Sequence, residues 1–167
     1  MLKIRCLLDL PILEIKSGAQ IGEAQEVVLD IEKAAVAGVI VTGANWFSES
    51  QGIYFCDIQR IGRDAIMVHD KEVVTSLSDI QQATGVYCSK SLFDKQIYTE
   101  AGISLGSLVD ILFDEITGEI REYELSDGIV TDLLRGRMIM PMPPAQVVST
   151  DKLIVPETMA KLLHAEM

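Results

Sequence analysis

Long apolar segments, clustered metal-ligating residues and basic residues are all scarce in this 167-residue chain. No run approaches the roughly 20 consecutive apolar residues that span a bilayer, and the longest, Ala34–Val41, is only as long as a strand. The opening stretch, MLKIRCLLDLP, has too short an apolar segment and no small-residue cleavage site for a secretory signal. We therefore expect a cytoplasmic protein without a transmembrane segment.

Basic side chains are outnumbered, since 14 Lys and Arg face 25 Asp and Glu and give a formal net charge of −11. Such a surface repels a phosphate backbone, so direct binding to nucleic acid is disfavoured. An acidic field suits a basic protein surface, although the same charge also serves solubility alone. We expect a protein partner, with a basic protein among the candidates, and the sequence leaves a homodimer open.

Residues that carry chemistry are few and scattered. Cys6, Cys56 and Cys88 show no ligand spacing with one another or with the two histidines, so we expect no metal and no cofactor. Neither glycine-rich phosphate loop, GxGxxG or GxxxxGKS/T, is present. In the best acidic cluster, strand periodicity places Asp110 and Asp114 on an outward face, where solvated carboxylates make poor acid–base partners. The sequence thus predicts a protein that is not an enzyme.

The chain repeats itself, and Gly22 aligns with Gly106 at an offset of 84 residues. The paired positions include two pairs of glycines and one pair of aspartates: Gly18 with Gly102, Gly22 with Gly106, and Asp30 with Asp114. Further along, Ile58–Val68 matches Ala145–Val155 at an offset of 87. Chance matching of apolar residues does not explain paired glycines and aspartates, so the sequence indicates a duplicated unit.

Within each copy the apolar residues follow the periodicity of strands. Val109, Ile111 and Phe113 recur at every second position, which is typical of a half-buried strand. The following Thr117–Gly118 pair predicts a hairpin turn, because glycine adopts positive φ without steric cost. Short strands with frequent turn signals predict an all-β chain, and closing each copy into a small antiparallel barrel removes exposed sheet edges.

Helical signals are confined to two short segments. Residues 75–85 contain serine caps, apolar residues on one face and a terminal glycine, and the tail places Pro156 in a first turn before apolar residues at helical spacing. The predicted organisation is a first barrel over residues 1–74, a helical linker over 75–88, a second barrel over 89–155 and a C-terminal helical tail over 156–167.

The order of strand, turn glycines, strand, Asp, hairpin and closing strand resembles the PRC-barrel family. The segments GAQIGEAQEVVLD at Gly18–Asp30 and GISLGSLVDILFD at Gly102–Asp114 carry the resemblance best. Ser126–Pro141 also resembles small PRC-barrel proteins of spore-forming bacteria. The chain as a whole is similar to two-barrel proteins of such organisms. The resemblance implies two tandem PRC-type barrels that act as protein-docking or regulatory modules. It transfers no functional residue, because its shared positions are turn glycines and core residues.

The first copy is apolar at several positions where the aligned second copy is polar. Two loop aromatics add to this set, which therefore predicts a second apolar surface on the first barrel. That surface either packs internally, against the second barrel or the C-terminal helix, or forms a partner or dimer interface. The candidate interface residues are Ile12, Ile15, Ile40, Trp46 and Phe47.

A pair of arginines supplies a different hypothesis. Arg135 and Arg137 flank a glycine within an acidic protein, and two guanidinium groups can clamp a carboxylate or a phosphate. Pairing with the protein's own abundant acids is the simpler explanation of these arginines. The sequence therefore favours a non-enzymatic adaptor or regulatory docking module, with a small-ligand or anion sensor that uses Arg135 and Arg137 as the alternative.

Overall fold

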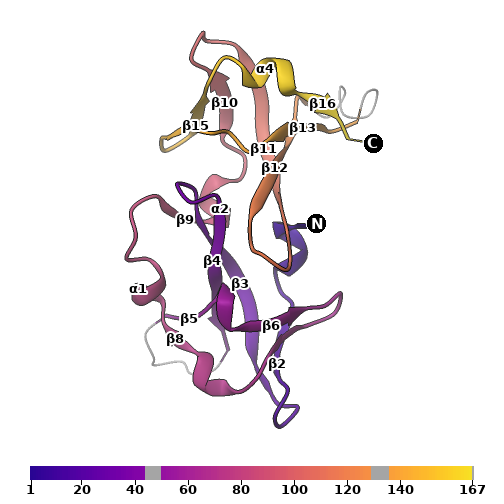
Figure 1. Ribbon diagram of the computed structural model, residues 1–167, viewed down its shortest axis with the longest axis vertical. Coiled ribbons are helices and arrows are strands. Elements are labelled where there is room, and N and C mark those ends of the chain that lie inside the picture. The colour runs from indigo at the N-terminus through magenta and orange to yellow at the C-terminus, as the bar shows by residue number, and fades with distance from the viewer. Residues whose placement is uncertain (44–49, 129–135, 167) are drawn as a thin grey trace. The chain divides into compact units, whose positions relative to one another are not determined.

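The computed structural model describes residues 1–43, 50–128 and 136–166. These residues group into two compact units (Figure 1). Unit 1 comprises residues 1–91 together with 113–119, and unit 2 comprises the remainder. Each unit is organised around one path of hydrogen-bonded strands, which confirms an all-β chain with one sheet for each copy of the repeat.

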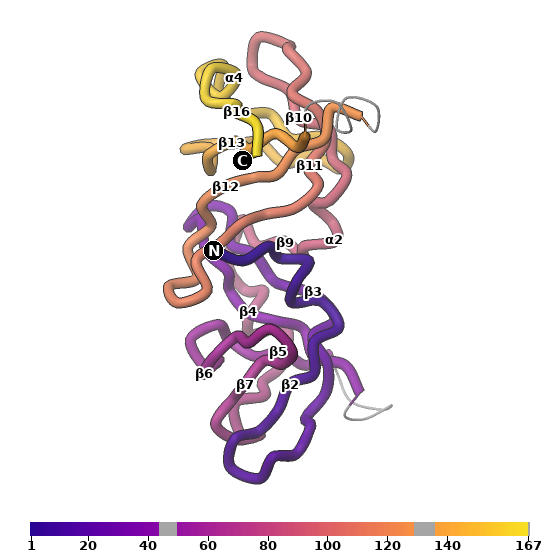
Figure 2. The backbone as a smooth tube through the Cα atoms, turned by 90° about the vertical axis from the view of Figure 1, so that its right-hand side faces the viewer, coloured from indigo at the N-terminus to yellow at the C-terminus, as the bar shows by residue number. Residues whose placement is uncertain are grey.

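The sheet of unit 1 runs in the order β6–β7–β2–β3–β4–β5–β8. Its strands are β2 (Pro11–Glu14), β3 (Gln20–Asp30), β4 (Ala35–Thr42), β5 (Gln51–Tyr54), β6 (Ile58–Ile61), β7 (Ile66–Val68) and β8 (Thr75–Ser76). The strand β9 (Val86–Cys88) also pairs with β3. Neighbours are antiparallel except for β2 and β7, and Figure 2 follows β6, β7 and β2 side by side. Short elements complete the unit: β1 (Leu2–Lys3), η1 (Ile4–Leu7), η2 (Phe55–Asp57), η3 (Lys71–Val73) and α1 (Leu77–Ile80).

Unit 2 repeats this arrangement in the order β14–β15–β10–β11–β12–β13–β16. Its strands are β10 (Gln96–Thr99), β11 (Ser104–Phe113), β12 (Ile120–Ser126), β13 (Met138–Pro141), β14 (Val147–Val148), β15 (Lys152–Val155) and β16 (His164–Ala165). The helix α2 (Ser89–Leu92) leads into it, and α4 (Met159–Leu162) precedes its last strand. The parallel pair β10–β15 corresponds to β2–β7, so both copies share one topology.

The alignment of the two copies changes by one residue at their first hairpin. Ile12 lies opposite Gly22, and Ile97 lies opposite Gly106, so Ile12 corresponds to Ile97 at an offset of 85. The offset of 84 residues that aligns Gly22 with Gly106 would pair Ile12 with Gln96, so the sequence alignment is corrected at this position. The cause is the β2–β3 turn, which is one residue longer than the β10–β11 turn. Because Ile12 and Ile97 are both fully buried, the two copies do not differ here.

The paired glycines and aspartates have distinct structural roles. A Cβ on Gly22 would lie 2.3 Å from the carbonyl oxygen of Thr42, and one on Gly106 would lie 2.4 Å from that of Ser126. Gly18 and Gly102 instead adopt φ of 74° and 81° in the first hairpin turn of each copy. The paired aspartates accept hydrogen bonds from backbone N–H groups in the next turn: Asp30 from Lys33, and Asp114 from Ile116 and Thr117. The residues shared by the two copies are therefore those that form turns or allow neighbouring strands to approach closely.

The predicted helical segments are mostly extended. The linker contains a single turn, α1, after which β9 pairs with β3 and buried Ser89 accepts a hydrogen bond from the backbone N–H of Val27. The tail likewise contains one turn, α4, and then β16, which pairs with β13. The prediction of a C-terminal helix over 156–167 is corrected accordingly. Helices this short gain little on their own, whereas the backbone of the tail finds partners on a sheet edge.

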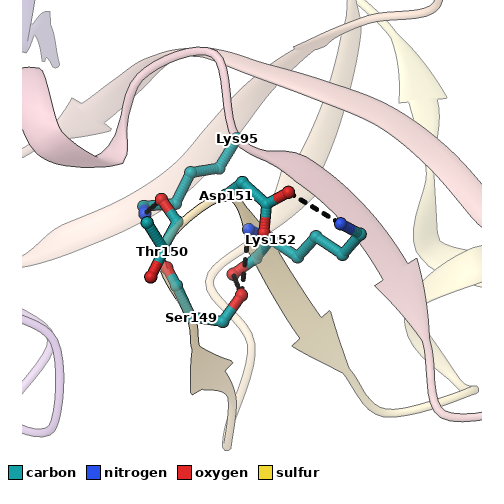
Figure 3. A network of polar contacts seen from close by, with 5 residues as sticks. All are labelled: Lys95, Ser149, Thr150, Asp151 and Lys152. Atoms are coloured by element: carbon teal, nitrogen blue, oxygen red, sulfur yellow. Dashed lines mark hydrogen bonds and ion pairs between the residues drawn. The ribbon is translucent and has the colours of Figure 1, made fainter.

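A buried lysine is peculiar to unit 2. Lys95 occupies the position of Leu10 in unit 1, because Asp94 and Asp9 before them share the same φ of 67°. Its ammonium group donates to the carbonyl oxygens of Ser149 at 2.6 Å and Thr150 at 2.5 Å (Figure 3). Lys95 therefore fixes the turn between β14 and β15 with charge-assisted hydrogen bonds.

Replacing Lys95 by methionine is expected to loosen this turn. The change keeps the stem but removes both donors from a site where Lys95 is 7% exposed, and we expect unit 2 to lose about 1.5–3 kcal/mol. Urea unfolding and amide exchange in the β14–β15 turn measure the loss. Lys152→Met is the control, because Lys152 pairs with Asp151 in a largely exposed ion pair, which contributes little to stability. Equal effects of the two variants would contradict the assigned role.

Candidate functional site

Two of the five predicted interface residues lie in the interior of unit 1. Ile12 is fully buried and Ile40 is 7% exposed. Ile40 packs with Val28 and Ile80, and Leu77 lies against the same cluster, so α1 covers the second apolar face of β4. The expectation that Ile12 and Ile40 present an open docking surface is therefore corrected. Within unit 1, the linker helix α1 covers Ile40.

The second copy has a buried charged residue at the same position. Glu124 corresponds to Ile40 and is only 5% exposed, although strand alternation after buried Tyr123 would place it near solvent. Its carboxylate lies 4.0 Å from Nε of Arg137. Arg137 thus contacts an acid of its own unit, which is the simpler of the two explanations offered by the sequence.

The remaining predicted site residues divide between surface and undescribed segments. Ile15 is 50% exposed and lies beside the β2–β3 turn. Trp46, Phe47 and Arg135 lie outside the described residues. Among the described residues, the predicted interface is therefore reduced to Ile15.

A cavity of about 490 Å³ lies at the edge of the unit 1 sheet. It is lined by Phe55 and Cys56 of η2, by all four residues of β6, and by Glu115 and Ile116 of the turn that follows β11. We call this cavity the β6 groove. Its volume falls within the range of sites that hold small ligands or peptide side chains.

The turn that carries Ile116 is held in place by several contacts within unit 1. The Asp114 carboxylate accepts from the backbone N–H of Ile116 at 2.8 Å, and the carbonyl of Gly118 accepts from the N–H of Val36 at 2.8 Å. The rings of Phe55 and Phe113 meet edge to face with centroids 6.5 Å apart. Ile116 is thereby left 85% exposed at the mouth of the groove, although burial is the usual state of isoleucine.

A glycine makes the contact between this turn and η2 possible. Gly118 has φ of 77°, and a Cβ there would lie 2.7 Å from the ring of Phe55. Only glycine therefore allows the turn to approach the aromatic ring closely. The same glycine was predicted from the sequence as a turn former, but its second role required the structure.

The β6 groove is lined by two charged side chains, Glu115 and Arg60, and they differ in whether they already have a partner of opposite charge. The Glu115 carboxylate lies 3.1 Å from the amino group of Met1, and a backbone hydrogen bond together with that amino group lowers the pKa of Glu115. Arg60 is exposed, and no carboxylate partner for it is found in the described parts of the chain. Arg63, just beyond β6, pairs with Asp64 at 3.0 Å. A guanidinium group that can accept an external anion therefore lines the groove.

The described residues offer little for covalent or metal chemistry. Cys6 and Cys56 are exposed free thiols, while burial and then the nearby Glu26 carboxylate raise the pKa of Cys88, which makes its thiol a poor nucleophile. Asp110, expected on an outward face, is 3% exposed because β11 is buried on both faces there. Across residues 1–43, 50–128 and 136–166, no three His, Cys, Asp or Glu side chains gather closely enough to hold a metal ion.

Sequence reasoning missed the β6 groove. One signal was available, since Ile116 stands at the apex of a predicted hairpin turn where polar residues are usual, and the first copy has Glu32 at the same place. The groove brings η2 and β6 together with a turn about 60 residues further along the chain, and no local sequence pattern predicts this contact. The edge position of β6 is likewise a property of the sheet order.

The architecture defines the class of protein: a tandem duplication of one small β unit, each copy with its own core. A family model, the PRC-barrel domain, matches residues 1–74 and again residues 85–162. The chain therefore belongs to the PRC-barrel family, as the two glycine-bearing segments indicated. No curated protein matches the chain closely enough to count as a relative. Within the described residues, no helix is both long and apolar enough to cross a bilayer.

Proposed function

We propose that this protein is a non-enzymatic adaptor or regulatory module that docks a partner protein through the β6 groove. The observation that carries the proposal is Ile116, an isoleucine that lines a cavity with both polar and apolar walls and is held 85% exposed by a capped and anchored turn. A single exposed apolar side chain is common on protein surfaces, but Ile116 lines one groove together with Ile58 and Ile61, and apolar residues gathered in a surface groove are typical of a binding site. The PRC-barrel architecture is compatible with this role.

The charge of the chain acts at a longer range than the groove. A net charge of −11 steers a basic protein toward the surface before contact, and the effect fades over about 8–10 Å at ordinary ionic strength. Binding then depends on the groove, where apolar burial and Arg60 act at contact. The adaptor hypothesis thus predicts association rates that fall as salt rises.

The test is affinity capture of the tagged protein from its own cells at low and physiological salt. Ile116→Glu is expected to weaken the retained partner about 10- to 100-fold, because the lost burial of one isoleucine is worth about 1.5–3 kcal/mol. Ile103→Glu is the matched control, since Ile103 is 55% exposed in unit 2 and outside the groove. Equal retention by both variants would contradict docking at the groove, and melting curves confirm that each variant is folded.

The anion-sensor alternative has less support. Arg137 lies 4.0 Å from the buried Glu124 carboxylate, so its guanidinium group already faces an anion of its own chain. The clamp also requires Arg135, which lies outside the described residues. We therefore place the adaptor function first.

A further inference from the structure

The edge strand β6 differs from the other strands that end the two sheet paths. β6 has four residues, whereas β8, β14 and β16 have two each. In the described part of the chain β6 pairs with β7 alone, which leaves its other side without a strand. An unpaired edge of this kind is a template for a further strand.

The β6 groove lies on this edge strand. All four residues of β6 line the cavity, and Gln59 and Arg60 are exposed while Ile58 and Ile61 are half-buried. Ile116 adds an apolar wall from the turn after β11. A strand laid along β6 would therefore satisfy backbone hydrogen bonds and at the same time place a side chain in the groove, against its apolar residues Ile61 and Ile116.

The charge of the groove determines which partner segments can bind there. Arg60 is the cation of the groove, and Glu115 is already 3.1 Å from the amino group of Met1. A carboxylate on the incoming segment would meet Arg60, whereas a lysine or arginine at that place would be repelled. A β-bulge between Ile58 and Arg60 also interrupts the regular ladder, which discourages unselective pairing along this edge.

From these observations we infer the chemistry of the partner. The β6 groove binds an extended segment of another protein, which pairs with the free edge of β6, inserts an apolar side chain beside Ile61 and Ile116, and places a carboxylate against Arg60. The inference rests on the proposed docking function and adds the conformation and the charge of the docked segment. The partner can be basic overall, because its net charge acts through the long-range field and its carboxylate only at contact.

The experiment uses the full chain and a displayed library of random short peptides. Peptides selected by the wild-type protein are expected to share an acidic residue near an apolar one. Arg60→Glu should weaken these peptides about tenfold or more and should select peptides with lysine or arginine at the acidic position. N-methylation of the peptide backbone should abolish binding, and bound peptide should slow amide exchange in β6.

Several results would overturn the inference. A library without an enriched motif or binding that survives N-methylation excludes strand pairing at β6, and a motif unchanged by Arg60→Glu excludes the contact between Arg60 and a carboxylate. Protection of β6 in concentrated protein without peptide would assign the edge to a second copy of the chain instead. If acidic peptides bind but capture from cells retains no protein, the adaptor function fails and the groove chemistry stands. If a captured protein is lost with Ile116→Glu but kept with Arg60→Glu, the function stands and this inference fails.

Discussion

Replacing Ile40 by glutamate is expected to unfold unit 1 or to destabilise it by more than about 3 kcal/mol. Ile40 is 7% exposed and packs with Val28 and Ile80, so the new carboxylate would be buried among apolar side chains. At the equivalent position in unit 2, Glu124 is tolerated because Arg137 lies 4.0 Å away. A buried carboxylate without such a cation loses its hydration and gains nothing in return.

Urea unfolding followed by circular dichroism measures this effect. Ile15→Glu is the control from the same predicted set, because Ile15 is 50% exposed and its replacement should change stability by about 0.5 kcal/mol or less. If Ile40→Glu unfolds at the wild-type urea concentration, α1 does not cover β4 in solution. In that case the second apolar face of the first barrel would again be a candidate docking surface.

Replacing Gly22 by alanine is expected to cost unit 1 about 3 kcal/mol. The added Cβ would lie 2.3 Å from the carbonyl oxygen of Thr42 and 2.7 Å from a side-chain carbon of Val41. Thr42 pairs within the sheet, so its backbone cannot move without disturbing the ladder between β3 and β4. Gly106→Ala should act on unit 2 in the same way, with added strain from its φ of 105°.

Gly18→Ala separates steric crowding from backbone strain. Apart from its chain neighbours, no described residue lies within 4 Å of a Cβ at Gly18, so the positive φ of 74° is what opposes alanine, at about 1–2 kcal/mol. The midpoints of urea unfolding rank the variants. A Gly18→Ala loss as large as that of Gly22→Ala would contradict the assignment of Gly22 to a close strand contact.

The duplicated β architecture could be predicted because its signals are local. Gly18, Gly102 and Gly118 mark turns through the backbone conformations that only glycine adopts easily, and the paired aspartates cap the turns that follow. Strand periodicity then indicates the core, as at Ile111 and Phe113, which are fully buried. These features depend on residues that are close together in the chain, so they can be predicted from the sequence.

The surface and the charged interior could not be predicted in the same way. Ile40 is internal because α1, almost 40 residues further along, covers it, and Glu124 is internal because Arg137 accompanies it. The alternation rule assumes one buried face for each strand, and both β4 and β11 break it locally. Whether an apolar side chain is surface or core thus depends on which distant segment packs over it.

The sequence by itself determined that this chain is an acidic all-β protein built from two copies of a PRC-type unit. Its paired glycines, paired aspartates and strand periodicity act through local backbone geometry, which needs no knowledge of the rest of the fold. Only the tertiary structure decided that Ile12 and Ile40 are core, that β6 ends its sheet, and that Ile116 stands exposed beside Arg60. Sheet order and long-range contact create those features, because hydrogen-bond partners and buried neighbours come from residues far apart in the chain.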